Sequence, residues 1–74
     1  MNNVCCIHID DHIDSIRASA IREELMRMPH VVNVENPQQS PQNMTVEFER
    51  HFNVPMDMML RLEKRHLHPD ILVC

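Results

Sequence analysis

Apolar and polar residues alternate in two stretches of the chain, residues 4–9 and 44–49, and this period of two predicts strands with one buried face. The apolar residues that would share the buried face are Cys5, Ile7, Ile9, Met44, Val46 and Phe48. Two further runs rich in β-branched residues, 31–36 and 71–74, predict two more strands. The polar segment 37–43 between the second and third strands contains two prolines and predicts a hairpin connection.

A first helix is predicted between the first two strands. Asp14 or Ser15 is a suitable N-cap, and Pro29 stops the helix because proline cannot continue the hydrogen-bond ladder. The residues at helical spacing, which we expect to be buried, are Ala18, Ile21, Leu25 and Met28.

A second helix is predicted to open at residues 53–55, with Pro55 near the first turn, where a missing N–H costs nothing. Helical spacing places Met56 and Met59 toward the core and leaves Met58 exposed. We expect residues 66–70 to end this helix.

The predicted order is βαββαβ, which is typical of the α+β class and of a ferredoxin-like two-layer sandwich. Such a fold has a four-stranded antiparallel sheet with two helices on one face, and here it would form a single domain over residues 1–74. Right-handed crossovers place the first strand between the third and the last, with the second at an edge. The loop after the first strand and the loop before the last strand then lie at the same end of the molecule.

Charge and composition exclude several classes of function. Seven Lys and Arg against eleven Asp and Glu give a net charge of −4, which argues against a nucleic-acid binder and a basic membrane-surface segment. No apolar run approaches the roughly 20 residues that span a bilayer, and the first residues lack the pattern of a signal peptide. We therefore expect a cytoplasmic protein without membrane insertion.

Enzymatic activity is not expected. The sequence has no glycine, which excludes a phosphate-binding P-loop and a dinucleotide fingerprint, and no Ser or Cys has a base at a recognisable spacing. Six histidines, seven methionines and three cysteines instead favour metal chemistry.

Residues 21–34 (IREELMRMPHVVNV) resemble the heavy-metal-associated domain, the family of copper chaperones and of the N-terminal domains of metal-pumping P-type ATPases. Family members read Ile-Glu-x-x-Leu-x-x-Leu-Pro-Gly-Val-x-x-Val here, and His30 replaces the glycine. Residues 44–48 and 54–55 also fit the family's third strand and second helix. The resemblance implies the fold predicted above, a role in metal trafficking or its regulation, and a metal-transporting membrane protein or its soluble domain as partner.

The family's Met-x-Cys-x-x-Cys metal site is missing from this chain. Counting back from Pro29 without a gap puts His12, Asp14 and Arg17 at the methionine and the two cysteine positions. Arginine stays protonated and cannot ligate a metal, so the usual copper site is absent.

An Asp/His site is the first candidate to replace it. The ligands would come from the loop after the first strand and the loop before the last: Asp10, Asp11, His12, Asp14, His66 and His68. Imidazole and carboxylate suit a divalent transition metal such as zinc, nickel or cobalt. The alternative is a solvated acidic loop with surface histidines, in which Asp14 only caps the helix.

A second candidate cluster lies at the other end of the sheet. If Ile71 and Val73 point inward, Cys74 faces the open side of the sheet with Cys6 and His8, and these three would form a sulfur–nitrogen site for zinc or copper. The alternative is that all three cysteines are reduced thiols, as the cytosol maintains.

Three function classes remain, and composition alone does not separate the third, an excised soluble domain of a larger transporter, from a free-standing chaperone. The first is metal-ion binding, trafficking or regulation linked to a metal transporter. The second is a protein-interaction or regulatory module without a metal, which docks or self-associates as a homodimer through an edge strand or the open sheet face. The side chains expected on that face are Val4, Cys6, His8, Thr45, Glu47 and Leu72.

Overall fold

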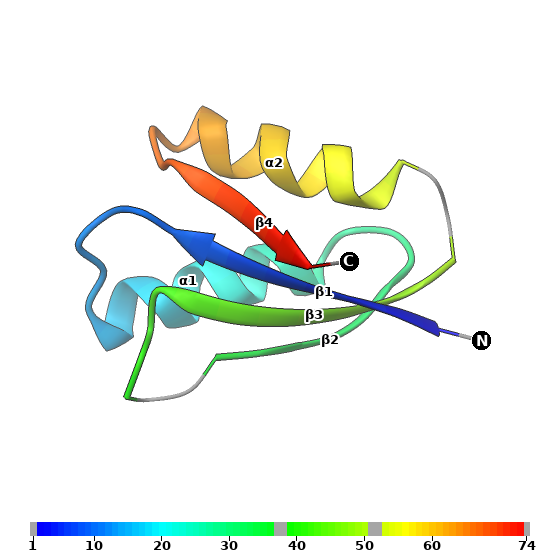
Figure 1. Cartoon of the computed structure of the whole chain (residues 1–74), viewed down its shortest axis with the longest axis horizontal. Coiled ribbons are helices and arrows are strands. Elements are labelled where there is room, and N and C mark those ends of the chain that lie inside the picture. Colours follow the sequence, from blue (N-terminus) through cyan, green and yellow to red (C-terminus); the bar gives the residue numbers. More distant parts are fainter. Residues whose placement is uncertain (1, 37–38, 51–52, 74) are drawn as a thin grey trace.

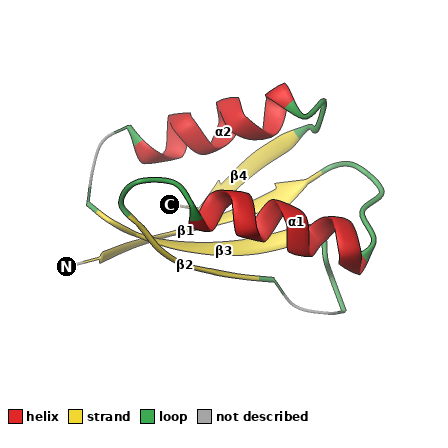
Figure 2. Ribbon diagram, turned by 180° about the vertical axis from the view of Figure 1, so that it is seen from behind, coloured by secondary structure: helices red, strands yellow, loops and turns green. Residues whose placement is uncertain are grey.

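The computed structural model describes residues 2–36, 39–50 and 53–73. The elements in chain order are β1 (Asn2–Ile9), α1 (Ser15–Met26), β2 (Val31–Glu35), β3 (Asn43–Glu49), α2 (Val54–Lys64) and β4 (Pro69–Val73). The strands form one antiparallel sheet in the order β2-β3-β1-β4, and both helices lie on the same side of it (Figures 1 and 2). The predicted α+β ferredoxin-like sandwich, with β1 between β3 and β4, is confirmed.

The core lies between the sheet and the helices. Every apolar residue predicted for the inner face of β1 and β3 is buried, and none is more than 3% exposed. Ala18, Ile21 and Leu25 of α1 cover them from the helical side, as the helical spacing predicts. Full burial of one large apolar side chain stabilises a fold by roughly 1.5–3 kcal/mol, so this layer supplies most of the driving force. Among the described residues, no helix is long and apolar enough to cross a membrane.

The ends of α1 are set by local hydrogen bonds. Asp14 is the N-cap, and its Oδ1 accepts a hydrogen bond from the backbone N–H of Arg17 at 2.7 Å. After the helix the chain reverses between Met28 and Val31, whose N–H donates to the Met28 carbonyl at 3.3 Å. The third residue of this turn is His30, which has φ = 72°.

The turn after α1 requires a residue with a positive φ at its third position. Proline at the second position of a turn and a positive φ at the third are the marks of a type II turn, in which glycine is favoured at the third position. Here Pro29 and His30 fill these positions. A chain without glycine must place another residue in the left-handed region, and histidine is one of those enriched there.

The inner face of α2 differs from the prediction. Met58 is fully buried, whereas Met56 is 64% exposed and Met59 is partly exposed, so the expected orientation of these methionines is wrong. The buried stripe is Val54, Met58 and Leu62, at spacing i, i+4 and i+8. This short helix has apolar residues on several sides, so the sequence allows either the face with Met56 and Met59 or the face with Met58 to be buried. Packing of the helix on the sheet buries the face with Met58.

The end of α2 is a Schellman motif with His66 in the left-handed position. The N–H of Leu67 donates to the Leu62 carbonyl at 3.1 Å, and the N–H of His66 donates to the Glu63 carbonyl at 3.0 Å. His66 has φ = 62°, and Leu62 and Leu67 are both buried, as the hydrophobic contact of this motif requires. The conformation of His66 is therefore explained by helix termination.

The register of β4 also differs from the prediction. Ile7 pairs with Ile71, but Cys6 pairs with Val73, because a bulge between Cys6 and Ile7 shifts the register. Val73 is 65% exposed, so the prediction that it points inward is wrong, whereas Ile71 packs against the core as expected. A bulge of this kind leaves no clear signal in an alternation pattern five residues long.

The left-handed backbone at His66 yields a stability prediction. This conformation costs a non-glycine residue about 1–2 kcal/mol, and glycine would remove that cost. Part of the gain in stability is offset because glycine loses more backbone entropy on folding. We expect His66→Gly to raise the free energy of unfolding by about 0.5–1 kcal/mol in urea denaturation. His12→Gly is the matched control, since His30 and His66 are the only described non-glycine residues with positive φ. A destabilised His66→Gly would contradict this account of the cap.

Candidate functional site

The loop after β1 and the loop before β4 lie side by side, as the topology predicts. The N–H of Asp10 donates to the His68 carbonyl at 2.9 Å, and the N–H of His68 donates to Asp11 Oδ2 at 2.6 Å. The His68 ring completes the contact, with Nδ1 3.0 Å from Asp11 Oδ1. The Gln42 side chain also donates to the Asp11 carbonyl, which ties the β2–β3 connection to the same end of the sheet.

The contact between Asp11 and His68 shifts the pKa of both residues. The side-chain hydrogen bond to His68, with the backbone bond from the same residue, lowers the pKa of Asp11 below its usual 3.8. The hydrogen bond to Asp11 and its negative charge raise the pKa of His68 above its usual 6.5. The His68 side chain is 77% exposed, so water screens the pair and its contribution to stability is small.

The two shifts define a pH window. The lowered pKa of Asp11 gives stability that is present above pH 3.8 and is lost as pH falls through the lowered value. The raised pKa of His68 gives stability that is present below pH 6.5 and is lost as pH rises through the raised value. The pair therefore stabilises the fold most between these two limits.

Substitution of Asp11 tests this pair. Asp11→Asn keeps an acceptor for the His68 N–H but removes the charge, so we expect the pKa of His68 to fall back toward 6.5 in an NMR titration of its ring. Asp10→Asn is the control, because the Asp10 side chain acts on the His68 ring only through a weaker charge interaction, and a smaller change in the pKa of His68 is expected. Equal changes in both variants would contradict a specific contact with Asp11.

The structure brings together only part of the predicted Asp/His set. Asp11 and His68 are in contact, whereas Asp14 caps α1 and His66 ends α2. His12 is exposed and has no side-chain hydrogen bond or ion pair with a described residue. Within residues 2–36, 39–50 and 53–73, no group of three or more His, Cys, Asp or Glu side chains is arranged to hold a metal ion.

Of the three residues predicted for the sulfur–nitrogen cluster, two lie within the described part of the chain. Cys6 and His8 both lie on the open sheet face, where Cys6 has a free thiol and His8 Nδ1 is 2.6 Å from Asn43 Oδ1. The carboxamide oxygen only accepts, so this contact requires the proton of His8 on Nδ1. Cys74 lies outside the described residues, and the residue paired with Cys6 on β4 is Val73.

The alternative of three reduced thiols does not hold for Cys5, which is buried and disulfide-bonded. The alternation of β1 predicted its burial. A disulfide pairing cannot be deduced from the spacing of cysteines in a sequence alone.

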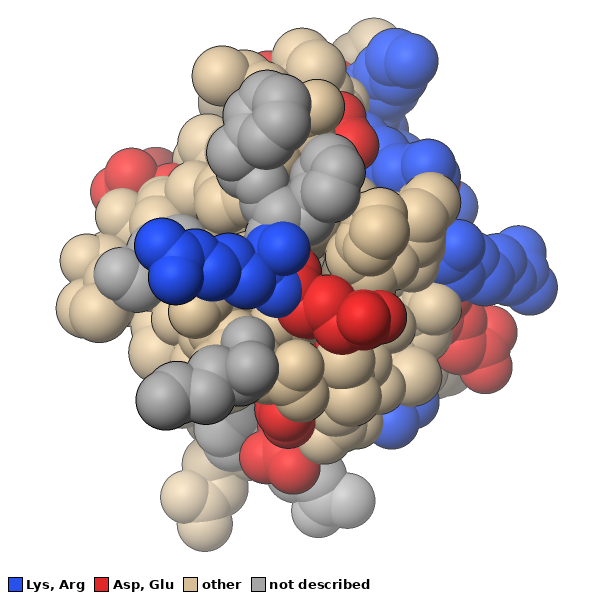
Figure 3. Space-filling view, turned by 90° about the vertical axis from the view of Figure 1, so that its right-hand side faces the viewer, with Lys and Arg blue, Asp and Glu red and all other residues tan. Residues whose placement is uncertain are grey.

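Charge is divided between the two layers of the fold. The strands contain no Lys or Arg, but they carry Glu35, Glu47, Glu49 and Asp70. Six of the seven basic residues lie in the helices or at their C-caps: Arg17, Arg22, Arg27, Arg61, Lys64 and Arg65. The seventh, Arg50, directly follows β3. In Figure 3 most of the blue side chains gather along the edge of the view that belongs to the helical side. The sheet layer is therefore acidic although the whole chain is only moderately so.

Apolar side chains are exposed where β4 meets β1. Val73 is 65% exposed beside Cys6, Leu72 is 59% exposed, and Val4, two residues before Cys6 on β1, is 47% exposed. We call Val4, Cys6, Leu72 and Val73 the sheet patch. It borders the acidic residues of β3 and lies at one edge of the sheet.

The two edges of the sheet differ in their backbone partners. At the β2 edge, Arg22 Nε of α1 donates to the Val34 carbonyl at 2.7 Å and occupies an acceptor. Among the described residues, no side chain donates to or accepts from the backbone of β4 in this way. An unpaired strand edge is a template for another extended segment, so β4 is the more accessible edge.

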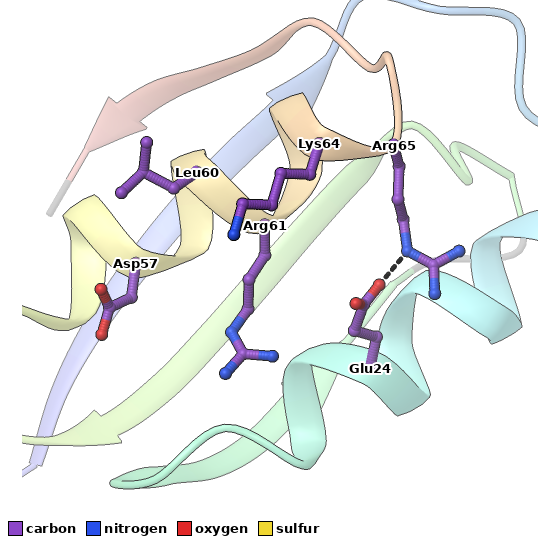
Figure 4. Close-up of a pocket in the computed structure, with 6 residues that line it drawn as sticks. All are labelled: Glu24, Asp57, Leu60, Arg61, Lys64 and Arg65. Atoms are coloured by element: carbon purple, nitrogen blue, oxygen red, sulfur yellow. Dashed lines mark hydrogen bonds and ion pairs between the residues drawn. The ribbon is translucent and has the colours of Figure 1, made fainter.

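A cavity of about 360 Å³ opens between the two helices (Figure 4). Its walls are Glu24, Asp57, Leu60, Arg61, Lys64 and Arg65. This site was not predicted from the sequence. The signal for it was the spacing of three cations at i, i+3 and i+4 in the second helix, which places them on one side of α2.

Comparison of the chain with protein-family models and with curated proteins gives no match. The resemblance to the heavy-metal-associated domain therefore stays a prediction that depends on the residues quoted for it.

Proposed function

We propose that this protein is an interaction module that binds an extended, basic segment of a partner protein along the outer edge of β4. The observation that carries the proposal is the position of a free strand edge beside the sheet patch and the acidic open face. A cytoplasmic location is not part of the proposal, because a disulfide-bonded Cys5 is typical of an oxidising compartment.

Backbone hydrogen bonds supply the first part of the interaction. An added strand pairs its N–H and C=O groups with those of the edge strand, and pockets for alternate side chains supply selectivity. Pro69 protects the start of β4, since proline has no N–H to donate to an added strand. The Leu72–Val73 end has no such protection, and its side chains offer an apolar contact.

The charge of the sheet supports a basic partner. With four acidic residues and no Lys or Arg on its strands, the sheet attracts a segment in which Lys or Arg alternates with apolar residues. Two copies of this chain would bring like charges together across the same face. A homodimer through the sheet is therefore disfavoured relative to a basic partner.

A synthetic peptide of alternating valine and lysine tests the proposal. We expect it to shift the backbone amide signals of β4 and β1 in a saturable way. Val73→Lys places a like charge on the edge and is expected to weaken binding about tenfold or more. Ile16→Lys is the matched control, because Ile16 is 81% exposed on α1, and binding should be unchanged.

Three results would overturn the proposal. The first is equal binding of a valine–glutamate peptide, which would remove the role of charge. The second is equal affinity of the Val73→Lys and Ile16→Lys variants. The third is a dimer in sedimentation that Val73→Lys dissociates, since the occupant of the edge would then be a second copy.

Divalent metal binding is the second candidate, and the observation that favours it is the Asp11–His68 contact. His68 Nε2 is not used in that contact, and Asp10 and His12 lie next to Asp11 in the chain. The described residues do not form a complete ligand set, so binding requires His12 or His66 to move toward this pair. A metal-transporting membrane protein or its soluble domain would then be the partner.

A zinc, nickel or cobalt titration of the protein tests this second candidate. We expect saturable amide shifts confined to residues 10–14 and 66–70, lost in His68→Ala and kept in His8→Ala. Shifts centred on Cys6 and His8 would favour the sulfur–nitrogen cluster instead. The absence of any saturable shift would reject both metal sites.

A further inference from the structure

We propose that the cavity between α1 and α2 is a binding site for a small organic phosphate, with Arg61 as the central residue. This site is on the helical side of the sheet and is independent of the proposed strand-binding edge. Three features of the cavity support this proposal: the charges that line it, the pairing of those charges, and its size.

Three of the seven basic residues of the chain line this one cavity: Arg61, Lys64 and Arg65. Cations in the last turns of a helix are also favoured by the helix dipole, which accounts for their position along α2. The dipole does not account for the side chain of Arg61, which extends from α2 toward α1 in Figure 4.

Only one of the three cations is paired across the cavity. Arg65 Nε donates to Glu24 Oε2 of α1, and this ion pair joins the two helices at one side of the cavity. Arg61 and Lys64 have no side-chain hydrogen bond or ion pair with a described residue, although Asp57 lies at i−4 from Arg61. Their donors are therefore available to a ligand.

Oxyanion chemistry fits these donors. The planar guanidinium binds two phosphate oxygens at once, and a lysine ammonium adds a point charge. The exposed side chain of Leu60, also in the cavity wall, offers an apolar contact for the organic part of the ligand. A volume of about 360 Å³ is within the range for small-molecule sites.

The two carboxylates of the cavity limit the size of the anion. Asp57 and Glu24 lie on opposite sides of Arg61 in Figure 4. An acidic peptide or a nucleic-acid strand would have to pass one of these carboxylates and would be repelled. A small neutral organic group that carries a single phosphoryl group can reach Arg61 and Lys64 without passing either carboxylate.

Titration with phenyl phosphate at low salt, followed by backbone amide NMR, tests the site. We expect saturable shifts at residues 57–65 and at Glu24, and weaker binding of inorganic phosphate, which lacks a group to contact Leu60. Arg61→Gln should weaken binding at least fivefold, and Arg61→Lys should recover only part of it. Arg17→Gln is the control, because Arg17 lies in the first turn of α1 and outside the cavity.

The absence of saturable shifts, or equal affinity of Arg61→Gln and Arg17→Gln, would overturn the proposal. Tighter binding of an aspartate oligopeptide than of phenyl phosphate would overturn it as well. Shifts of the same residues with protein concentration alone would show that a second copy occupies the cavity, again against the proposal. Val73→Lys should bind phenyl phosphate normally, so failure of this site and failure of the strand-binding edge can be told apart.

Discussion

The sheet of this protein has one buried face because apolar and polar side chains alternate along its two central strands. Burial of Ile7 and Val46 under the helices forces their neighbours Cys6 and Glu47 to the other side. The same constraint therefore builds the core and determines the open face. Six of the seven basic residues lie in the helices or at their ends, and the seventh, Arg50, follows β3, so the strands carry none. Both proposed binding sites follow from this division of charge between the two layers.

Connections in a chain without glycine depend on two histidines. His30 reverses the chain after α1 and His66 ends α2, each with a positive φ that glycine would adopt more easily. Two residues after His66, His68 lies beside Asp11, at the point where β4 begins to pair with β1. Histidine content that suggests metal chemistry thus has, at two positions, a backbone explanation.

Much of the fold could be predicted from the sequence, because its signals are local and strong. Alternation predicted the central strands, and a capping residue at Asp14 or Ser15 predicted the start of α1, where Asp14 is the cap. The orientation of Met58 and the exposure of Val73 could not be predicted, since they depend on tertiary packing and on a bulge. Of the candidate ligands, topology correctly placed Asp11 near His68. Proximity in the sequence could not show that Asp14 would cap α1 and that His66 would end α2.

Amide hydrogen exchange of the free and peptide-bound protein tests the central claim, that the outer edge of β4 accepts a basic strand. The account predicts that β4 amides without a partner on β1 exchange rapidly in the free protein and become protected when a valine–lysine peptide is added. The amides of β2, where Arg22 occupies the Val34 carbonyl, should not change. Protection at β2, or no protection at β4, would contradict the account.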